Sequence, residues 1–328
     1  MTSRHSFDAL LAAIAPMLAQ GRLEQALHAT MRMLATSPDS RELHTLSLGM
    51  LHHLPLHVRL VMTTAYCRAA GCDGPVALVE RLEALFGAHP DRYEMFASLG
   101  SLLVAQDLPE LAVRTFGNAL RPADEAATTP AAIAAEYGLT GPQYDDNPIH
   151  QATIDGFLTL LGESLEGRRD GLTIVDAACG TGLAAPVLRP MAARLIGLDL
   201  APAMLARAEQ GGQYDQLIAG DMVAAMAAMP DQADLVVCSG ATYYLKDIGP
   251  FLAAARICLK PGGQLFFSDI PAPDGMGVMH TLGGTPRYCR DAALMRNLAD
   301  RHGLEARPPV LERSFLLPAY HWLLRRRW

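Results

Sequence analysis

Thr173-Ile-Val-Asp176 runs directly into Ala177-Ala-Cys-Gly180-Thr-Gly182-Leu183, and this stretch decides the fold. Its first residues have the apolar, β-branched character of a buried strand. The two glycines allow a sharp backbone turn and the close approach of a ligand, which a Cβ would hinder. A helical pattern follows at once. We therefore predict a strand, a glycine-rich turn and a helix that together bind a nucleotide, with a plain tight turn as the alternative.

Two acidic residues end the next two predicted strands. Asp199 closes the strand Leu195-Ile-Gly-Leu-Asp199, 17 residues after Gly182, and Asp221 follows Ala219-Gly220. Neighbouring parallel strands bring their carboxyl ends to one edge of a sheet, so Asp199 can accept hydrogen bonds from a ribose diol. Asp221 can likewise accept from the exocyclic amine of adenine, while Met222 packs on the ring. A helix cap is the alternative role for each acid.

From residue 172 onward, apolar runs of strand length alternate with helical patterns. Such alternation indicates crossover units and a parallel sheet that is buried on both faces. The expected strands cover residues 172–177, 194–199, 216–219, 233–239 and 264–269, and the expected helices cover 183–191, 203–210, 222–229 and 248–259. Two later segments, residues 304–311 and 319–326, have no helix between them and predict an antiparallel pair that closes the sheet.

The first third of the chain has a different periodicity. Between residues 7 and 122, apolar residues recur at three- and four-residue spacing, which predicts paired amphipathic helices. The part that begins at Tyr93 has small residues where two antiparallel helices must touch, and it resembles one tetratricopeptide unit. Residues 121–130 are polar, small and bracketed by prolines, which is typical of a linker. Residues 131–161 are expected to be helical, with a break at 138–142.

Composition excludes several classes of protein. Half of the 328 residues are hydrophobic and 19% are charged, so the chain is expected to be globular. Its 27 basic and 34 acidic residues give a net charge of −7, which would repel a nucleic acid. The six cysteines are far apart and have no nearby histidine, which favours a reduced, cytoplasmic location over a disulfide framework or a zinc site. No apolar run reaches the ~18 residues that a membrane span needs, so we expect no membrane partner. The charge and the cysteine spacing likewise lead us to expect no nucleic-acid partner and no metal.

Residues 172–328 resemble the class I S-adenosylmethionine (SAM)-dependent methyltransferases. The resemblance is carried by five ordered motifs: Val175–Gly182, Gly197–Met204, Gly220–Met222, Val237–Gly240 and Leu259–Gly263. It implies SAM as the cofactor and a Rossmann-like, seven-stranded α/β methyltransferase domain. The full prediction is an all-α tetratricopeptide-like domain over residues 1–125, a linker with lid helices over 126–171 and the methyltransferase domain over 172–328. This combination also resembles a group of predicted bacterial methyltransferases.

The same resemblance implies which residues bind the cofactor. They are Asp176, Ala178, Cys179, Gly180, Gly182, Asp199, Leu200, Met204, Asp221, Met222, Ser239 and Gly240. The loop 177–182 would lie under the methionine moiety, Asp176 would help to hold this loop, and Ser239 would face the sulfonium and the acceptor. Ala177-Ala178 departs from the Leu-Gly of many members, and a positive φ at Ala178 would be strained.

An NAD-linked dehydrogenase is the main alternative enzyme. Gly180-Thr-Gly-Leu-Ala-Ala185 satisfies the dinucleotide pattern G-x-G-x-x-A, and Asp199 would serve the ribose of NAD equally well. Asp176 argues against this alternative, because a dinucleotide-binding strand is normally apolar at that position. The turn Leu259–Gly263 and the terminal antiparallel pair are also typical of methyltransferases. A non-catalytic SAM-binding module is a third alternative, against which the intact glycines and both acids argue.

The chemistry of methyl transfer limits which residues the reaction needs. Transfer from a sulfonium is an in-line displacement, so alignment and exclusion of water are the main requirements. A hydroxyl or a protonated amine as acceptor would also need a base. The candidate catalytic residues are Tyr144, His150 and Tyr243, and Tyr244, Asp269 and His280 are expected nearby.

We expect Tyr144 and His150 to belong to a lid over SAM, because they precede the first strand and an open sheet needs a cover there. A small-molecule acceptor, methylated at O or N, is favoured, with the helical domain as lid or homodimer contact. The alternative is a protein or carrier-bound substrate that the helical domain recruits, since tetratricopeptide arrays present a concave surface to partners.

Overall fold

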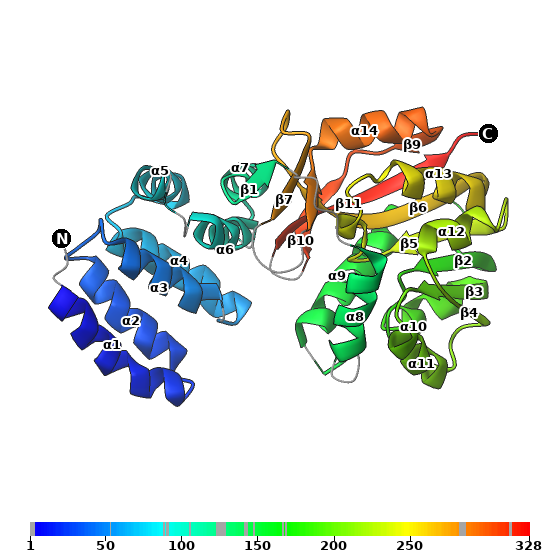
Figure 1. The fold of residues 1–328 in the computed structure, drawn as a ribbon. Helices are drawn as coiled ribbons and strands as arrows, with labels where there is room; N and C mark the ends of the chain where they lie inside the picture. The colour runs from blue at the N-terminus through cyan, green and yellow to red at the C-terminus, as the bar shows by residue number, and fades with distance from the viewer. Residues whose placement is uncertain are drawn as a thin grey trace. The chain divides into compact units, whose positions relative to one another are not determined.

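The computed structural model describes residues 4–52, 54–87, 89, 92–104, 106–122, 129–140, 144–146, 148–165, 167, 169–281, 287–314 and 317–328. The chain divides into two compact units, Met1–Leu120 and Arg121–Trp328. Figure 1 labels the elements of both units, and each unit is described by itself.

The first unit is helical, as its periodicity predicts. Its helices are α1 (Arg4–Ala19), α2 (Leu23–Leu34), α3 (Arg41–His52), α4 (Leu56–Ala69), α5 (Pro75–Phe86), α6 (Arg92–Val104) and α7 (Pro109–Gly117). The small residue Gly100 lies where α6 meets α7, because a Cβ at this position would be 3.0 Å from the Cβ of Phe116. The helices of this unit are thus confirmed, and their tetratricopeptide-like identity stays a prediction. The short strand β1 (Leu120–Pro122) lies at the boundary of the two units.

The second unit contains the predicted parallel sheet. Its parallel strands are β2 (Leu172–Ala177), β3 (Ala192–Asp199), β4 (Gln216–Ala219), β5 (Ala233–Cys238) and β6 (Leu259–Pro271). They lie in the order β6-β5-β2-β3-β4, so the chain order reverses direction beside β2. Ligands bind at such a reversal, beyond the carboxyl ends of the strands. The Rossmann-like expectation for this unit is confirmed at the level of the sheet.

The C-terminal strands close one side of the sheet. The strand β11 (Leu317–Arg326) runs antiparallel to β6, with Tyr320 opposite Asp269 and Arg325 opposite Gln264. The strand predicted over 304–311 is split into β9 (Leu304–Ala306) and β10 (Val310–Ser314), and both pair with β11. Pro308 and Pro309 separate the two strands because proline has no N–H to donate to a ladder.

A hairpin and a helix are added between β6 and β9. The strands β7 (Val278–Thr281) and β8 (Tyr288–Arg290) form the hairpin, and β8 pairs with the end of β6, with Cys289 opposite Ile270. The helix α14 (Ala292–Arg301) follows and is capped by Asp291, whose carboxylate accepts from the N–H of Leu294 at 2.6 Å. The described sheet therefore has more strands than the seven that the sequence predicts.

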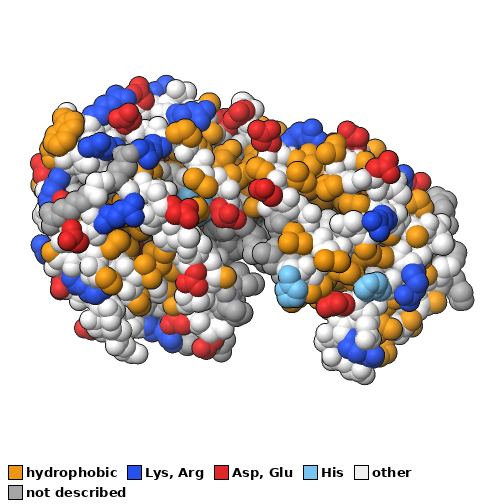
Figure 2. Space-filling view, turned by 180° about the vertical axis from the view of Figure 1, so that it is seen from behind, with side chains coloured by type: hydrophobic (Ala, Val, Ile, Leu, Met, Phe, Trp, Pro, Cys, Tyr) orange, Lys and Arg blue, Asp and Glu red, His pale blue; other side chains and the backbone are white. Residues whose placement is uncertain are grey.

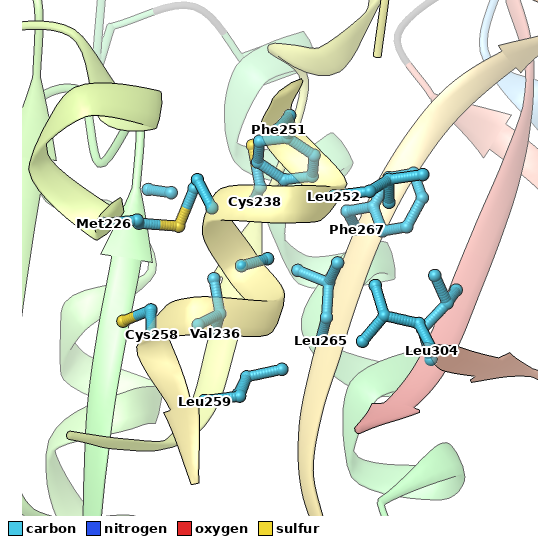
Figure 3. Packing of buried hydrophobic residues seen from close by; sticks show 14 of the residues in the cluster. Met226, Val236, Cys238, Phe251, Leu252, Cys258, Leu259, Leu265, Phe267 and Leu304 are labelled. Carbon is cyan, nitrogen blue, oxygen red and sulfur yellow. The ribbon is translucent and has the colours of Figure 1, made fainter. Parts of the chain in front are cut away.

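Helices cover both faces of this sheet (Figure 1). One face packs against α12 (Met222–Ala227), α13 (Gly249–Cys258) and α14, and the other packs against α9 (Pro148–Ser164) and α10 (Ala185–Leu188). Figure 3 shows the first of these cores, where Phe251 of α13 lies against Phe267 of β6. Cys238 and Cys258 are fully buried there.

The remaining helices lie around the carboxyl edge of the sheet. They are α8 (Pro130–Thr140), α11 (Pro202–Gly211) and the short 3-10 turn η3 (Thr242–Tyr244), whereas the 3-10 turn η2 (Arg189–Met191) leads into the amino end of β3. The helix α8 continues through 138–140, where the sequence predicts the start of a break, and the last two residues of that predicted break, 141 and 142, lie outside the described residues. Across the described ranges, no helix is both long and apolar enough to cross a membrane.

Candidate functional site

A pocket of about 850 Å³, including its open mouth, lies at the carboxyl edge of β2, β3, β4 and β5. This volume is in the range of small-molecule sites in proteins. The predicted cofactor-binding residues that line it are Ala178, Gly180, Asp199, Leu200, Met204, Asp221, Met222, Ser239 and Gly240. Asp176, Cys179 and Gly182 lie outside this lining. The structure therefore brings the ends of four predicted strands together at one site.

Asp199 joins the glycine loop to the start of α11. Its Oδ2 accepts from the N–H of Gly180 at 2.8 Å, and its Oδ1 accepts from the N–H of Ala201 at 2.8 Å. Burial raises the pKa of Asp199, and these backbone N–H groups oppose the rise. Each carboxylate oxygen can accept a further hydrogen bond, so Asp199 can serve both the backbone and a ligand in the pocket.

Asp221 caps the helix α12, which is the alternative role that the sequence raised. Its Oδ1 accepts from the N–H groups of Val223 and Ala224 at 2.9 and 3.0 Å. Among the described residues, Oδ2 has no hydrogen-bond partner, and Asp221 lines the pocket beside Met222. The cap and a ligand contact are compatible because they use different oxygens.

The glycine loop adopts left-handed backbone conformations. Ala178 has a φ of +60°, so the strain expected for a non-glycine residue here is present, and Gly180 has a φ of +56°. Cys179 is buried below the loop, and burial raises the pKa of its thiol. Gly197 of β3 permits this packing, because a Cβ there would be 2.9 Å from the Cys179 Sγ.

Asp176 lies below the loop and does not line the pocket. Its Oδ2 accepts from the hydroxyl of Tyr214 at 2.7 Å, and burial raises its pKa to about 7. The Tyr214 ring in turn lies 3.2 Å from where a Cβ of Gly182 would be. Asp176 therefore contacts the loop through Tyr214, a residue that no motif indicated.

Residues 130–140 and 144–146, here named the cover, contribute side chains to the lining of the pocket, and their role as a lid stays a prediction. Pro130, Ile133 and Tyr137 of α8 and the ring of Tyr144 are part of its lining. His150 lies outside the lining and supports Tyr144, because its Nδ1 bonds the Tyr144 carbonyl at 2.8 Å and its ring lies 3.8 Å from the Tyr144 ring. The helix α8 also packs against α11.

Asp145 ties this cover to the sheet. Its Oδ1 accepts from the Thr181 hydroxyl at 2.5 Å, and its Oδ2 accepts from Arg207 of α11 at 2.8 Å. One carboxylate thus connects the covering segment to the glycine loop and to α11. The sequence analysis missed this contact, for which the acidic turn at 144–146 was the only signal.

The other candidate catalytic residues lie around the turn that follows β5. Tyr244 lines the pocket, whereas Tyr243 is buried behind it. Asp269 is buried and accepts from the hydroxyl of Thr242 at 2.9 Å and from Arg290 at 3.0 Å, outside the lining. The side chain of His280 lies outside the described residues.

Four lining residues had not been singled out from the sequence: Pro130, Ile133, Tyr137 and Leu245. A tyrosine in the alanine-rich helix α8 was the one available signal, since its polar tip needs a partner when buried. Among the described residues, no group of three or more His, Cys, Asp or Glu side chains could hold a metal ion.

Comparison with known proteins identifies the kind of domain that carries this pocket. Residues 175–267 match the family model of a methyltransferase domain. Over 136 residues, the chain is 31% identical to the ubiquinone biosynthesis O-methyltransferase of Pseudomonas savastanoi pv. phaseolicola, and the match covers 39% of this chain and 53% of that protein. Over 140 residues, it is 31% identical to the malonyl-[acyl-carrier protein] O-methyltransferase of Yersinia pestis, and the match covers 42% of this chain and 50% of that protein.

The chain thus spans about half the length of the curated relatives it matches. Solved structures of similar fold include the magnesium protoporphyrin IX methyltransferase of Synechocystis PCC 6803, with a TM-score of 0.48 and 16% identity over 62% of this chain and all of that chain. Another is the 1,6-didemethyltoxoflavin-N1-methyltransferase of Burkholderia thailandensis, with a TM-score of 0.49 and 16% identity. That match covers 63% of this chain and 95% of the other chain. The matched segment is thus similar to methyltransferase domains, and SAM is the cofactor that the match supports.

Proposed function

We propose that this protein transfers the methyl group of SAM to an O or N atom of a small-molecule acceptor. The observation that carries the proposal is the meeting of Asp199 and Asp221 at one rim of the pocket, beside the glycine loop. Both acids keep an acceptor for a ligand after their contacts with the backbone. The family match and the O-methyltransferase relatives support the same activity.

SAM fits the residues that line the pocket. Asp199 would accept from the ribose hydroxyls, and the free oxygen of Asp221 would accept from the adenine amine, with Leu200 and Met222 as apolar contacts. Bound SAM supplies an electrophilic methyl group on a sulfonium. The chain's own contribution is alignment and exclusion of water, for which Tyr137 and Tyr144 form the cover.

Calorimetry with SAM and with NAD tests this proposal and its main alternative together. We expect SAM to bind the unmodified protein and NAD to leave no signal. Asp199→Asn should weaken SAM affinity about 10- to 100-fold, because a charged acceptor shared by backbone and ligand is lost. Asp274→Asn is the matched control, since Asp274 is exposed and far from the lining. Failure of SAM to bind the unmodified protein would refute the proposal.

A carrier-bound acceptor is the second candidate. One relative, by its name, acts on malonyl-[acyl-carrier protein], and this chain has an all-helical first unit in addition to its methyltransferase domain. In this version the helical unit recruits the carrier. Transfer of labelled methyl to carrier-bound but not to free acceptor would favour it.

A nucleic-acid substrate is opposed by how the basic side chains are paired. Near the C-terminus, Arg326 contacts Asp231 and Arg327 contacts Asp300, while Lys260 contacts Asp234. On the face seen in Figure 2, basic and acidic side chains are interspersed. A polyanion would have to break these pairs.

A further inference from the structure

Part of the lining of the pocket is aromatic. Tyr137 lies between Tyr144 and Tyr244, with ring centroids 6.1 and 6.2 Å away, and all three line the pocket. Ile133 and Leu245 add aliphatic surface to the lining. Such a wall accommodates a flat, apolar molecular body.

The tyrosine hydroxyls gather around one guanidinium. The hydroxyl oxygens of Tyr137 and Tyr244 are 3.0 Å apart, and Tyr137 is also hydrogen-bonded to Tyr243. Arg287, which directly precedes β8, donates to the Tyr244 hydroxyl, and its guanidinium carbon lies 5.5 Å from the centroid of the Tyr243 ring. The formal charge in this cluster is therefore positive.

Arg287 differs from the nearby Arg290 in its partners. Arg290 is buried and donates to both oxygens of Asp269 at 3.0 Å, so its charge is matched. Within the described part of the chain, Arg287 has no carboxylate partner, and its Nε is buried without a hydrogen-bond partner. A half-buried cation without a counter-ion is costly and is typical of a site that receives an anion.

The described residues of the lining offer no free base. Asp199 and Asp221 are engaged by backbone N–H groups and face the expected cofactor. Burial raises the pKa of Tyr144 to about 12 and raises that of Tyr137 as well, so both hydroxyls keep their protons near neutral pH. An acceptor atom that still carries its proton would find no group here to take it.

We propose that the acceptor is a small molecule with a flat apolar body and an anionic oxygen, either a carboxylate or a phenolate. This inference rests on the proposed function and deepens it. The Tyr244 hydroxyl accepts from Arg287 and donates to the hydroxyl of Tyr137, which in turn donates to the anionic oxygen, so Arg287 acts as a positioning residue through Tyr244. A lone pair of that oxygen forms the new O–CH₃ bond, the S–CH₃ bond breaks and its electron pair stays on sulfur. No proton moves, and the sulfonium becomes a neutral thioether.

The test measures binding to the protein loaded with S-adenosylhomocysteine (SAH), the product of the donor. Ligand-observed NMR compares benzoate with its neutral isostere benzamide, and compares 4-nitrophenol below and above its own ionisation. We expect at least one of the two anions to bind about tenfold tighter than its neutral counterpart. Benzoate and 4-nitrophenolate distinguish the two sources of anionic oxygen.

Two variants test whether the preference for the anion depends on Arg287 and the tyrosine hydroxyls. Arg287→Gln should remove the anion preference while the affinities for benzamide and SAH stay unchanged, and Tyr244→Phe should reduce it by removing the link to Tyr137. Arg296→Gln, an exposed arginine of α14, is the control with the same change of charge. Unchanged SAH affinity in each variant shows that the fold and the cofactor site are intact.

The outcomes separate this inference from the proposed function. If SAH binds and neither anion binds better than its neutral counterpart, the inference fails and the proposed function stands. An anion preference that survives Arg287→Gln also overturns it. If SAH itself does not bind, the proposed function fails and the inference with it.

Discussion

Ala178 is the residue at which the backbone of the pocket carries strain. An L-residue with a φ of +60° brings its Cβ close to its own carbonyl oxygen, at a cost of about 1–2 kcal/mol. The loop holds this conformation because its neighbours are anchored, Cys179 through the carbonyl of Leu198 and Gly180 through Asp199. The surrounding contacts therefore determine the loop conformation against the preference of this one residue.

Ala178→Gly should release this strain. We expect the free energy of unfolding to rise by about 0.5–1 kcal/mol, because the relief exceeds the added entropy of the unfolded chain. Chemical denaturation measures the change, and SAM affinity should be retained. Ala177→Gly, in the buried strand β2, is the control and should destabilise the protein. If both variants lost the same free energy of unfolding, Ala178 would not be strained in the folded protein.

Asp176 gives stability a dependence on pH. Its pKa is about 7 in the folded protein, mainly because of burial, and near 3.8 in the unfolded chain. Between these values the folded state binds more protons, so this residue's contribution to stability is complete at low pH and is lost as the pH rises through 7, by on the order of 4 kcal/mol.

Asp176→Asn keeps an acceptor for Tyr214 but cannot ionise. This variant should be more stable than the unmodified protein at pH 8, and the difference should vanish near pH 4. Urea unfolding at both values measures it, with exposed Asp274→Asn as control. A difference that is the same at both pH values would show that Asp176 ionises normally in the fold.

Sequence motifs predict the part of the site where we propose that SAM binds, and not the part where we propose that the methyl acceptor binds. Asp199 and Asp221 follow strands at fixed positions near the glycines, so their neighbourhood can be inferred from sheet geometry alone. Tyr137 and Arg287 come from a helix and a hairpin whose approach to the pocket depends on tertiary packing. No local spacing encodes that approach.

At the scale of elements, the cover over the pocket depends on few contacts. The turn 144–146 is held by Asp145 through Thr181 and Arg207, and α8 packs on α11. A segment with few anchors opens at a lower free energy than the core. Asp145 is thus placed to control how long a ligand stays in the pocket.

Asp145→Ala should loosen the cover without unfolding the protein. We expect SAH to dissociate about tenfold faster and backbone amides of α8 to exchange faster with deuterium, because two charge-assisted contacts are lost. Stopped-flow displacement and hydrogen exchange measure these effects. Asp146→Ala, the exposed neighbour, is the matched control. Identical SAH release from both variants would show that Asp145 does not hold the cover.

The core strands of the sheet were predictable and its additions were not. Strands β2 and β4 have the expected bounds because each is an apolar run between turns. The hairpin strands β7 and β8 have four and three residues, too few for a periodic pattern. The expected strand over 304–311 contains Pro308-Pro309, which could have indicated its division.

At the scale of the whole molecule, all lining residues of the pocket belong to the second unit, Arg121–Trp328. The two cores that hold its sheet are built from this unit alone. Cofactor binding therefore has no structural requirement for the helices of the first unit.

A chain of residues 121–328 should fold and bind SAH within about twofold of the affinity of the full protein, because a compact unit with its own core is autonomous. Calorimetry on both chains measures this, with circular dichroism as the check on folding. A folded fragment that fails to bind SAH would assign part of the cofactor site to the helical unit.

The hairpin β7–β8 pairs with the last residues of β6 through β8, and Arg287, which precedes β8, lies beside the ring of Tyr243. The residues proposed to bind SAM and the arginine proposed to position the acceptor thus belong to different elements. Under the proposed function, substitutions within this hairpin would change the preference for the acceptor and leave SAM binding intact. Grafting this hairpin between related enzymes would be the corresponding route to redesign.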